Sequence, residues 1–75
     1  MDEKFKLLIS EALELDISEV NEGLALDPEE NWDSIALLSV ISAIDTQYEI
    51  QLDGDELENC SSVSDVYNLL AKSLR

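Results

Sequence analysis

Apolar side chains recur at helical spacing in three stretches of this chain, and this periodicity constrains the fold more than any other feature. The first stretch runs from about Glu3 to Leu15 and follows the i, i+3, i+4, i+7, i+8 pattern of an amphipathic helix: Phe5, Leu8, Ile9, Ala12 and Leu13. A second helix from Ser34 to about Tyr48 and a last one after Ser62 have core stripes at Leu37, Val40, Ile41, Ile44 and Tyr48, and at Val63, Val66, Tyr67, Leu70 and Leu74. In no segment do apolar and polar residues alternate as they do in a half-buried strand, so the pattern predicts an all-α protein.

The connections between these helices contain a short helix and one long loop. Asp53 with Glu56 is typical of a capping box and predicts a short third helix. Between Asp16 and Trp32 the chain is rich in turn-forming residues, and four apolar residues are expected to tether this loop to the core: Ile17, Val20, Leu24 and Leu26. A loop of this length usually has a role or partial structure of its own. Residues 1–75 are therefore expected to form a single domain, a four-helix bundle with three longer helices, one short third helix and a long loop between helices 1 and 2.

Acidic residues outnumber basic residues 18 to 4, which gives a net charge of −14 at pH 7. The basic residues lie only near the two ends of the chain: Lys4, Lys6, Lys72 and Arg75. An apolar content of 45% with helical periodicity favours a folded domain over the disorder that such a charge would otherwise suggest. An acidic surface repels nucleic acid and anionic membranes and attracts proteins with basic patches. We therefore expect protein partners, no nucleic acid and no membrane, and a monomeric chain.

The residues that common enzyme chemistry needs are scarce. The chain has no histidine, which excludes Ser-His-Asp and Cys-His arrangements, and we assign no catalytic residue. One cysteine and no histidine disfavour zinc, and Asp53-Gly54-Asp55 lacks the spacing of a calcium loop, so no metal site is predicted. Cys60 cannot form an internal disulfide and is expected to be a buried small apolar residue. Neither a signal peptide nor an apolar span of membrane length is found, which predicts a cytoplasmic protein.

The dipeptide Asp33-Ser34 stands at the predicted start of the second helix and is followed by the apolar Ile35. A serine hydroxyl at this place lies beside unpaired N–H groups and the positive end of the helix dipole, which suit a phosphate oxygen. An Asp or Ser at a helix start is also typical of an ordinary N-cap, so the dipeptide alone decides nothing. The preceding Trp32 is expected to pin the loop onto the bundle.

Taken in order, these features resemble the acyl carrier protein family over essentially the whole chain. The similar segments are Asp33-Ser34-Ile35 (Asp-Ser-Leu in the family), Tyr48-Glu49-Ile50-Gln51-Leu52 (aromatic-x-Ile-x-Ile) and Ser62-Val63-Ser64-Asp65-Val66 (Thr-Val-x-Asp-Leu). The resemblance implies that a phosphopantetheinyl transferase moves 4′-phosphopantetheine from coenzyme A onto Ser34, and that Asp33 helps present the serine. It implies a carrier, not an enzyme, that holds acyl groups as thioesters for enzymes of fatty-acid or specialised acyl or polyketide metabolism.

The resemblance also assigns two sets of binding residues. One face of the second helix would meet acyl-loading, condensing or acyl-transfer enzymes with basic patches: Ile35, Leu38, Ser42, Asp45 and Glu49. An acyl cavity would be lined by Leu38, Ile41, Ile50, Val63 and Leu69. The family usually presents several glutamates along this helix, whereas Ala36, Ser39 and Ser42 occupy much of that surface here. We interpret this difference as the mark of a specialised-pathway member.

Two alternative functions share many of these features. An acidic helical adaptor that binds a basic protein and is never modified has the same composition, but it needs no free hydroxyl at Ser34. An aminoacyl or peptidyl carrier protein uses the same arm and a similar fold. Many peptidyl carriers have Gly-Gly-His/Asp-Ser around the serine, which Asn31-Trp32-Asp33-Ser34 does not match. The sequence therefore favours acyl cargo.

Overall fold

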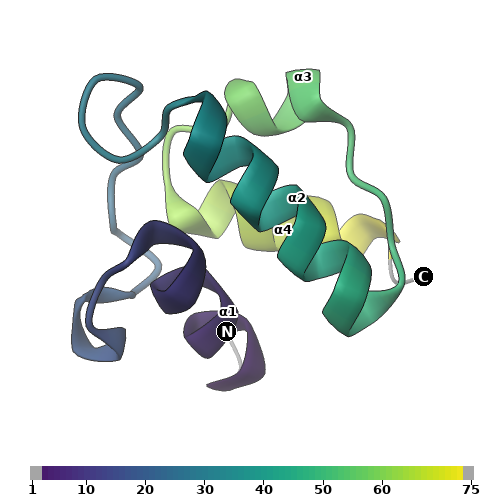
Figure 1. The fold of residues 1–75 in the computed structure, drawn as a ribbon, viewed down its shortest axis with the longest axis horizontal. Coiled ribbons are helices and arrows are strands. Elements are labelled where there is room, and N and C mark those ends of the chain that lie inside the picture. The colour runs from purple at the N-terminus through teal and green to yellow at the C-terminus, as the bar shows by residue number, and fades with distance from the viewer. Residues whose placement is uncertain (1–2, 74–75) are drawn as a thin grey trace.

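The computed structural model describes residues 3–73, and within these residues the regular structure consists of four α-helices and one 3-10 turn. The elements in chain order are α1 (Glu3–Leu13), η1 (Ile17–Glu19), α2 (Ser34–Tyr48), α3 (Gly54–Glu58) and α4 (Val63–Ser73). Figure 1 shows α2 crossing in front of α4, with the short α3 above them and α1 at the lower left. The prediction of an all-α fold with three longer helices and a short third one is confirmed.

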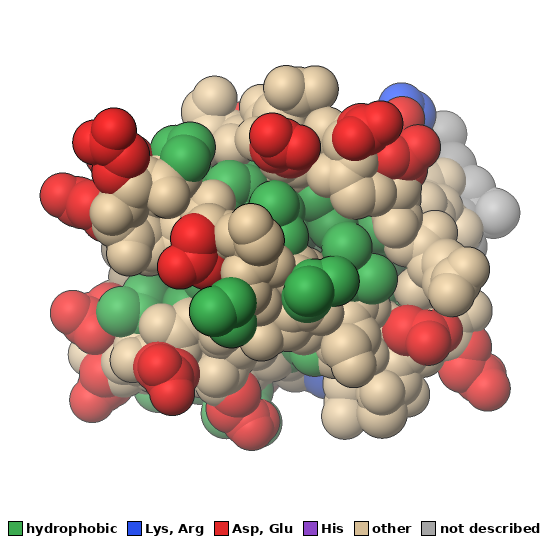
Figure 2. Space-filling model, turned by 45° about the horizontal axis from the view of Figure 1, so that its top comes forward, with side chains coloured by type: hydrophobic (Ala, Val, Ile, Leu, Met, Phe, Trp, Pro, Cys, Tyr) green, Lys and Arg blue, Asp and Glu red, His purple; other side chains and the backbone are tan. Residues whose placement is uncertain are grey.

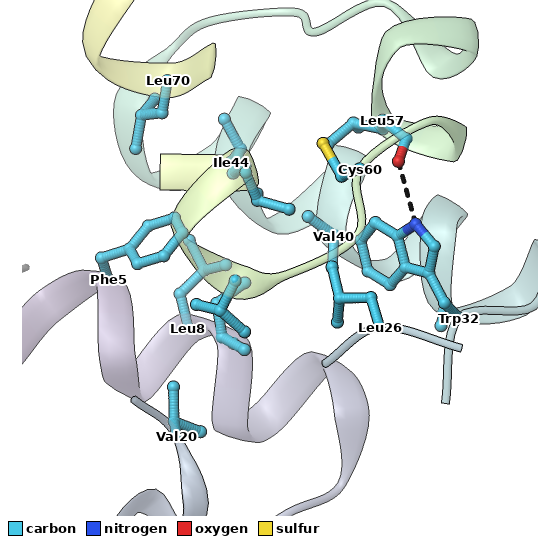
Figure 3. Close-up of a cluster of buried hydrophobic side chains, with 14 residues drawn as sticks. Phe5, Leu8, Val20, Leu26, Trp32, Val40, Ile44, Leu57, Cys60 and Leu70 are labelled. Atoms are coloured by element: carbon cyan, nitrogen blue, oxygen red, sulfur yellow. Dashed lines mark hydrogen bonds between the residues drawn. The ribbon is translucent and has the colours of Figure 1, made fainter. Parts of the chain in front are cut away.

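The core lies where the apolar stripes of the helices meet. The largest fully buried side chains come from all four helices and the long loop, and include Trp32, Phe5, Ile44, Leu57, Leu70 and Val40 (Figure 3). The Phe5 ring packs edge-on against Tyr67 of α4, with ring centroids 5.0 Å apart and planes at 72°. Because an edge-to-face pair adds about 0.5–1.5 kcal/mol to the burial of its rings, this contact stabilises the packing of α1 on α4.

The second helix begins and ends at the residues that the sequence predicts. On its core stripe Val40 and Ile44 are fully buried, and Leu37, Ile41 and Tyr48 are half-buried. The residues predicted for the neighbouring, partner-binding face are all exposed: Ile35, Leu38, Ser42, Asp45 and Glu49. Among residues 3–73 no helix combines the length and the apolar character needed to span a bilayer.

The long loop carries partial structure, which begins with a helix cap. The Asp16 carboxylate accepts a hydrogen bond from the Ser18 N–H at 3.0 Å, and the Glu19 carboxylate accepts one from the Asp16 N–H at 3.1 Å. Hydrogen bonds from the backbone and side chain of Ser18 lower the pKa of Asp16. This capping box was not predicted, because turn-forming residues and helix caps are the same residue types.

Two of the four apolar residues expected to tether the loop are buried, Val20 and Leu26, and Leu24 is half-buried. The prediction for Ile17 is wrong, since its side chain is 39% exposed. It opens the 3-10 turn η1, and this short turn lies at the surface with none of its residues buried.

Backbone hydrogen bonds join the loop to the start of α4. The Leu26 N–H donates to the Ser61 carbonyl at 2.9 Å, and the Val63 N–H donates to the Leu24 carbonyl at 3.0 Å. These bonds surround a single antiparallel bridge between Ala25 and Ser62. The loop is therefore fixed against the bundle by its backbone as well as by its apolar side chains.

The caps of the later helices agree with the sequence only in part. Asp53 caps α3 as predicted, but its carboxylate accepts from the Asp55 N–H at 2.8 Å and not from Glu56, three residues on. Lys72 lies in the last turn of α4, where a cation suits the helix dipole. Leu74, predicted for the same stripe, and the terminal Arg75 lie outside the described residues.

Both α1 and α2 end at a glutamate in the left-handed backbone conformation. Glu14 and Glu49 each have a φ of 56°, in the region that favours glycine. The helix α1 therefore ends at Leu13, two residues before its predicted end. The Leu15 N–H then donates to the Ser10 carbonyl at 2.8 Å, as in a Schellman motif. A carboxylate at a helix C-terminus also opposes the helix dipole.

Replacing Glu49 with glycine is expected to raise the free energy of unfolding by about 1 kcal/mol, since it removes a left-handed side chain and a misplaced charge. Glu14→Gly should give a similar gain. Glu49→Gln separates the two causes, because it removes only the charge and should gain less than glycine. Urea unfolding measures all three variants. A glycine variant that is no more stable than the parent would contradict the account of these helix ends.

Candidate functional site

The hydroxyl of Ser34 is exposed at the first residue of α2. Asp33 is the N-cap, and its carboxylate accepts a hydrogen bond from the Ala36 N–H at 2.9 Å. Within residues 3–73 nothing accepts a hydrogen bond from the N–H groups of Ser34 and Ile35, and the Ser34 hydroxyl has no partner. A phosphate group on the serine oxygen fits this place, because open N–H groups and the helix dipole favour an anion there.

Trp32 fixes this helix start to the end of α3. Its side chain is 2% exposed, and its Nε1–H donates to the Leu57 carbonyl at 2.9 Å (Figure 3). Its own backbone N–H donates to the Asp27 carbonyl at 2.9 Å, which closes the turn before the helix. The prediction that Trp32 pins the loop onto the bundle is confirmed. Asp33 and Ser34 are thus displayed at the surface directly after a buried anchor.

The five residues predicted to bind partners share the exposed surface of α2. Ile35 is 75% exposed and Leu38 is 65% exposed, which are high values for large apolar side chains. Ser42, Asp45 and Glu49 are exposed as well. Figure 2 shows hydrophobic side chains gathered across the face that carries α2 and α3, with acidic side chains around them. The exposed surface of α2 therefore has apolar side chains at its centre and acidic side chains around them.

The five residues predicted to line an acyl cavity range from surface to core. Leu38 lies at the surface, whereas Val63 is fully buried. Ile41, Ile50 and Leu69 are half-buried and pack against the core. Leu69 also borders an open recess of about 250 Å³ beside α3 and α4.

Cys60 is a buried small residue, as predicted, with 8% of its surface exposed. Its Sγ lies 3.5 Å from the carbonyl oxygen of Glu56. Burial, followed by the negative charges of Asp65 and Glu56, raises the pKa of the thiol from 9.0 to about 11. In the part of the chain that the structure describes, no three Cys, Asp or Glu side chains are grouped so that they could hold a metal ion.

Cys60 is expected to react slowly with a disulfide reagent near pH 8, since the thiolate is the reactive species. Unfolding in urea should restore the rate of an ordinary thiol. Because the pKa is raised in the folded state, the thiol does not weaken folding below pH 9.0, and stability should fall between there and about pH 11. Equal rates in the folded and unfolded protein would contradict this burial.

Two open recesses lie along the junction of α1 and α2, and neither was predicted from the sequence. Their volumes are about 400 and 410 Å³, and they share Glu11, Ala12 and Ser39, so they form one continuous surface, called here the α1–α2 groove. Its near end is lined by Asp33 and Ile35, beside Ser34, and its far end by Lys4 and Gln47. The signal in the sequence is small side chains at helical spacing on α2, at Ala36, Ser39 and Ala43, together with Ala12 on α1.

Comparison with known proteins gives consistent matches. A family model described as "Phosphopantetheine attachment site" matches residues 3–70. An acyl carrier protein of Thermotoga maritima is 31% identical over 71 residues, which are 95% of this chain and 88% of the relative. The acyl carrier protein of Clostridium acetobutylicum is 29% identical over 91% of this chain and 88% of its own, and that of Petrotoga mobilis 28% over 96% and 85%. No solved structure matches significantly.

Proposed function

Since the chain belongs to the acyl carrier protein family, we propose that its covalent 4′-phosphopantetheine arm is attached to the hydroxyl oxygen of Ser34. The observation that carries this proposal is the exposed, unpartnered hydroxyl at the N-terminus of a 15-residue helix. The cap at Asp33 leaves the N–H groups of Ser34 and Ile35 open toward an anion. Trp32 holds this helix start in place from the core side.

The protein is a phosphopantetheine carrier and not an enzyme. When the arm is bound, its terminal thiol supplies the site at which acyl groups are held as thioesters. We propose that the cargo belongs to fatty-acid metabolism or to specialised acyl or polyketide metabolism, because the exposed Ser42 lies on the surface of α2 where the family usually presents glutamates. Ala36 and Ser39, predicted for the same surface, do not lie on it, since Ala36 is buried and Ser39 is half-buried in the α1–α2 groove. In this proposal residues 1–75 act as one monomeric domain, and the carrier works in the cytoplasm.

A phosphopantetheinyl transferase and acyl-handling enzymes are the partners of such a carrier. We propose that they dock on the exposed face of α2. Ile35 and Leu38 supply apolar area at its centre, and Asp45 and Glu49 attract basic side chains toward it. We propose an acyl cavity lined by Leu38, Ile41, Ile50, Val63 and Leu69, of which Val63 is fully buried and Leu38 is exposed.

The test of the attachment site is intact-mass analysis after incubation with coenzyme A, Mg²⁺ and a broad-specificity phosphopantetheinyl transferase. We expect the mass to rise by one phosphopantetheine, and fragmentation to place it on Ser34 and on none of the other serines. No gain with several transferases, on a chain that circular dichroism shows to be helical, would favour the unmodified acidic adaptor. A gain on another serine would contradict the assignment of Ser34.

Asp33 has two separable roles in this proposal, since it caps α2 and presents the serine to the transferase. Asp33→Ala is expected to lower the free energy of unfolding by about 0.5–2 kcal/mol. Asp33→Asn keeps a good cap but removes the charge, so it should be nearly as stable as the parent. If the transferase binds the carboxylate, the rate at which Asp33→Asn is modified should be lower than that of the parent by a factor of about ten or more. Modification at the parental rate would leave Asp33 only its capping role.

A further inference from the structure

We infer that the near end of the α1–α2 groove is a docking site for a basic segment of the phosphopantetheinyl transferase. This inference rests on the proposed attachment at Ser34 and extends the proposed docking surface from the exposed face of α2 to its α1 side. The near end has a volume of about 410 Å³, and both sequence neighbours of Ser34, Asp33 and Ile35, line it. Ile35 also belongs to the proposed partner-binding face, so the two surfaces are continuous.

The lining of the near end fits a basic side chain. Its apolar part includes Leu13 and Ile35, and its charged part consists of four carboxylates: Glu11, Glu14, Glu30 and Asp33. All four carboxylates are exposed, and none forms an ion pair within residues 3–73. An arginine or lysine packs its apolar stem against apolar surface while its charged head meets carboxylates. The near end offers both kinds of surface within one recess.

The charge around Ser34 gives the transferase a reason to supply a cation here. Loading brings coenzyme A, which carries phosphate charges of its own, to a serine beside this acidic recess on a chain of net charge −14. Like charges that are brought together without a counter-charge cost free energy. Within residues 3–73 the one cation that lines the groove is Lys4, at the far end. The cation that offsets the repulsion at the near end therefore comes from the partner.

The groove is open to a protein partner because the phosphopantetheine arm is not drawn into it. The phosphate of the arm is an anion, and the carboxylates of the near end repel it. Figure 1 shows α1 and α3 on opposite sides of α2. The proposed acyl cavity includes Ile50, between α2 and α3, and Leu69 of α4. An arm that delivers its acyl group there leaves Ser34 on the side of α2 away from α1.

The rate of loading tests the contact. The triple variant Glu11→Gln/Glu14→Gln/Glu30→Gln removes three carboxylates of the near end and keeps Asp33. With a broad-specificity transferase, coenzyme A and Mg²⁺, its kcat/KM should fall by a factor of about ten or more, chiefly through a higher KM. The fold should be kept, since Glu11 and Glu14 lie at the end of α1, where their charges oppose the helix dipole.

The matched control removes three exposed carboxylates that do not line the groove: Glu22→Gln/Glu56→Gln/Glu58→Gln. It changes the net charge by the same amount, and its kcat/KM should fall by less than about threefold. Equal falls in the two triple variants would show that net charge alone steers the transferase, and would overturn the inference. A parental rate in the groove variant would overturn it as well.

Backbone amide signals locate the contact directly. The isotope-labelled chain is mixed with saturating transferase in the absence of coenzyme A. We expect the signals of Glu11, Glu14 and Glu30 to lose intensity together with that of Ile35, and the signal of Asn68 on α4 to keep its intensity. Losses confined to the exposed face of α2, with the three glutamates unchanged, would overturn the inference. Failure of the parent chain to gain phosphopantetheine would instead contradict the proposed attachment at Ser34.

Discussion

Replacing Trp32 with alanine is expected to lower the free energy of unfolding by about 3–5 kcal/mol. The side chain is 2% exposed and is the largest in the core, so the variant leaves a cavity where the long loop, α2 and α3 meet. A 75-residue domain has roughly 4–11 kcal/mol of stability in total. The loss therefore removes between about a quarter and all of that stability. Urea unfolding followed by circular dichroism measures it.

Two control variants separate ring burial from the hydrogen bond. Trp32→Phe keeps most of the apolar ring but removes the indole donor to the Leu57 carbonyl, which still accepts from the Cys60 N–H at 3.0 Å, so the variant should cost about 0.5–1.5 kcal/mol. Ile17→Ala changes an apolar side chain of the same loop that is 39% exposed, and should stay within about 0.5 kcal/mol of the parent. Trp32→Ala as mild as Ile17→Ala would contradict the role of Trp32 as an anchor.

Ser34→Ala is expected to abolish the gain of phosphopantetheine completely, because the variant lacks the only oxygen that the proposal allows to accept the phosphate. Its stability should stay within about 0.5 kcal/mol of the parent, since the cap of α2 is Asp33 and the serine is exposed. Intact mass and thermal unfolding, measured on the same sample, check both statements.

The matched control is Ser42→Ala, an exposed serine on the same helix. It should be loaded to completion, because it removes a hydroxyl without touching the helix start. A Ser34→Ala chain that still gains the arm would contradict the attachment site. Loss of loading in Ser42→Ala alone would show that the transferase contacts this serine of the exposed α2 face.

Much of the fold was predictable because its signals are local. The bounds of α2 follow from an Asp cap and an apolar stripe that continues to Tyr48, and both are readable in the sequence. The end of α1 was not predictable, since apolar periodicity continues to Leu15 and a left-handed glutamate has no sequence signature. Ile17 was misplaced for a related reason, because an apolar residue in a loop is ambiguous until the local turn is known.

In the candidate site, too, the local features were predictable from the sequence and the long-range contacts were not. The cap at Asp33 and the exposure of Ser34 depend on neighbours within three residues, and the sequence predicted both. The acceptor for Trp32 is a backbone carbonyl 25 residues away, at Leu57, and a carbonyl looks the same in every residue type. The α1–α2 groove depends on how two helices pack side by side, which small residues permit but do not specify.

The position of Trp32 also gives the protein an intrinsic optical reporter. It is the single tryptophan of the chain, two residues before Ser34, and its indole is buried with its N–H bound to the Leu57 carbonyl. Indole emission shifts to longer wavelength when the ring meets water. Any opening between the start of α2 and the end of α3 should therefore raise the wavelength of maximum Trp32 emission. Fluorescence of the unlabelled chain can therefore follow, in real time, whether loading or partner docking loosens this junction.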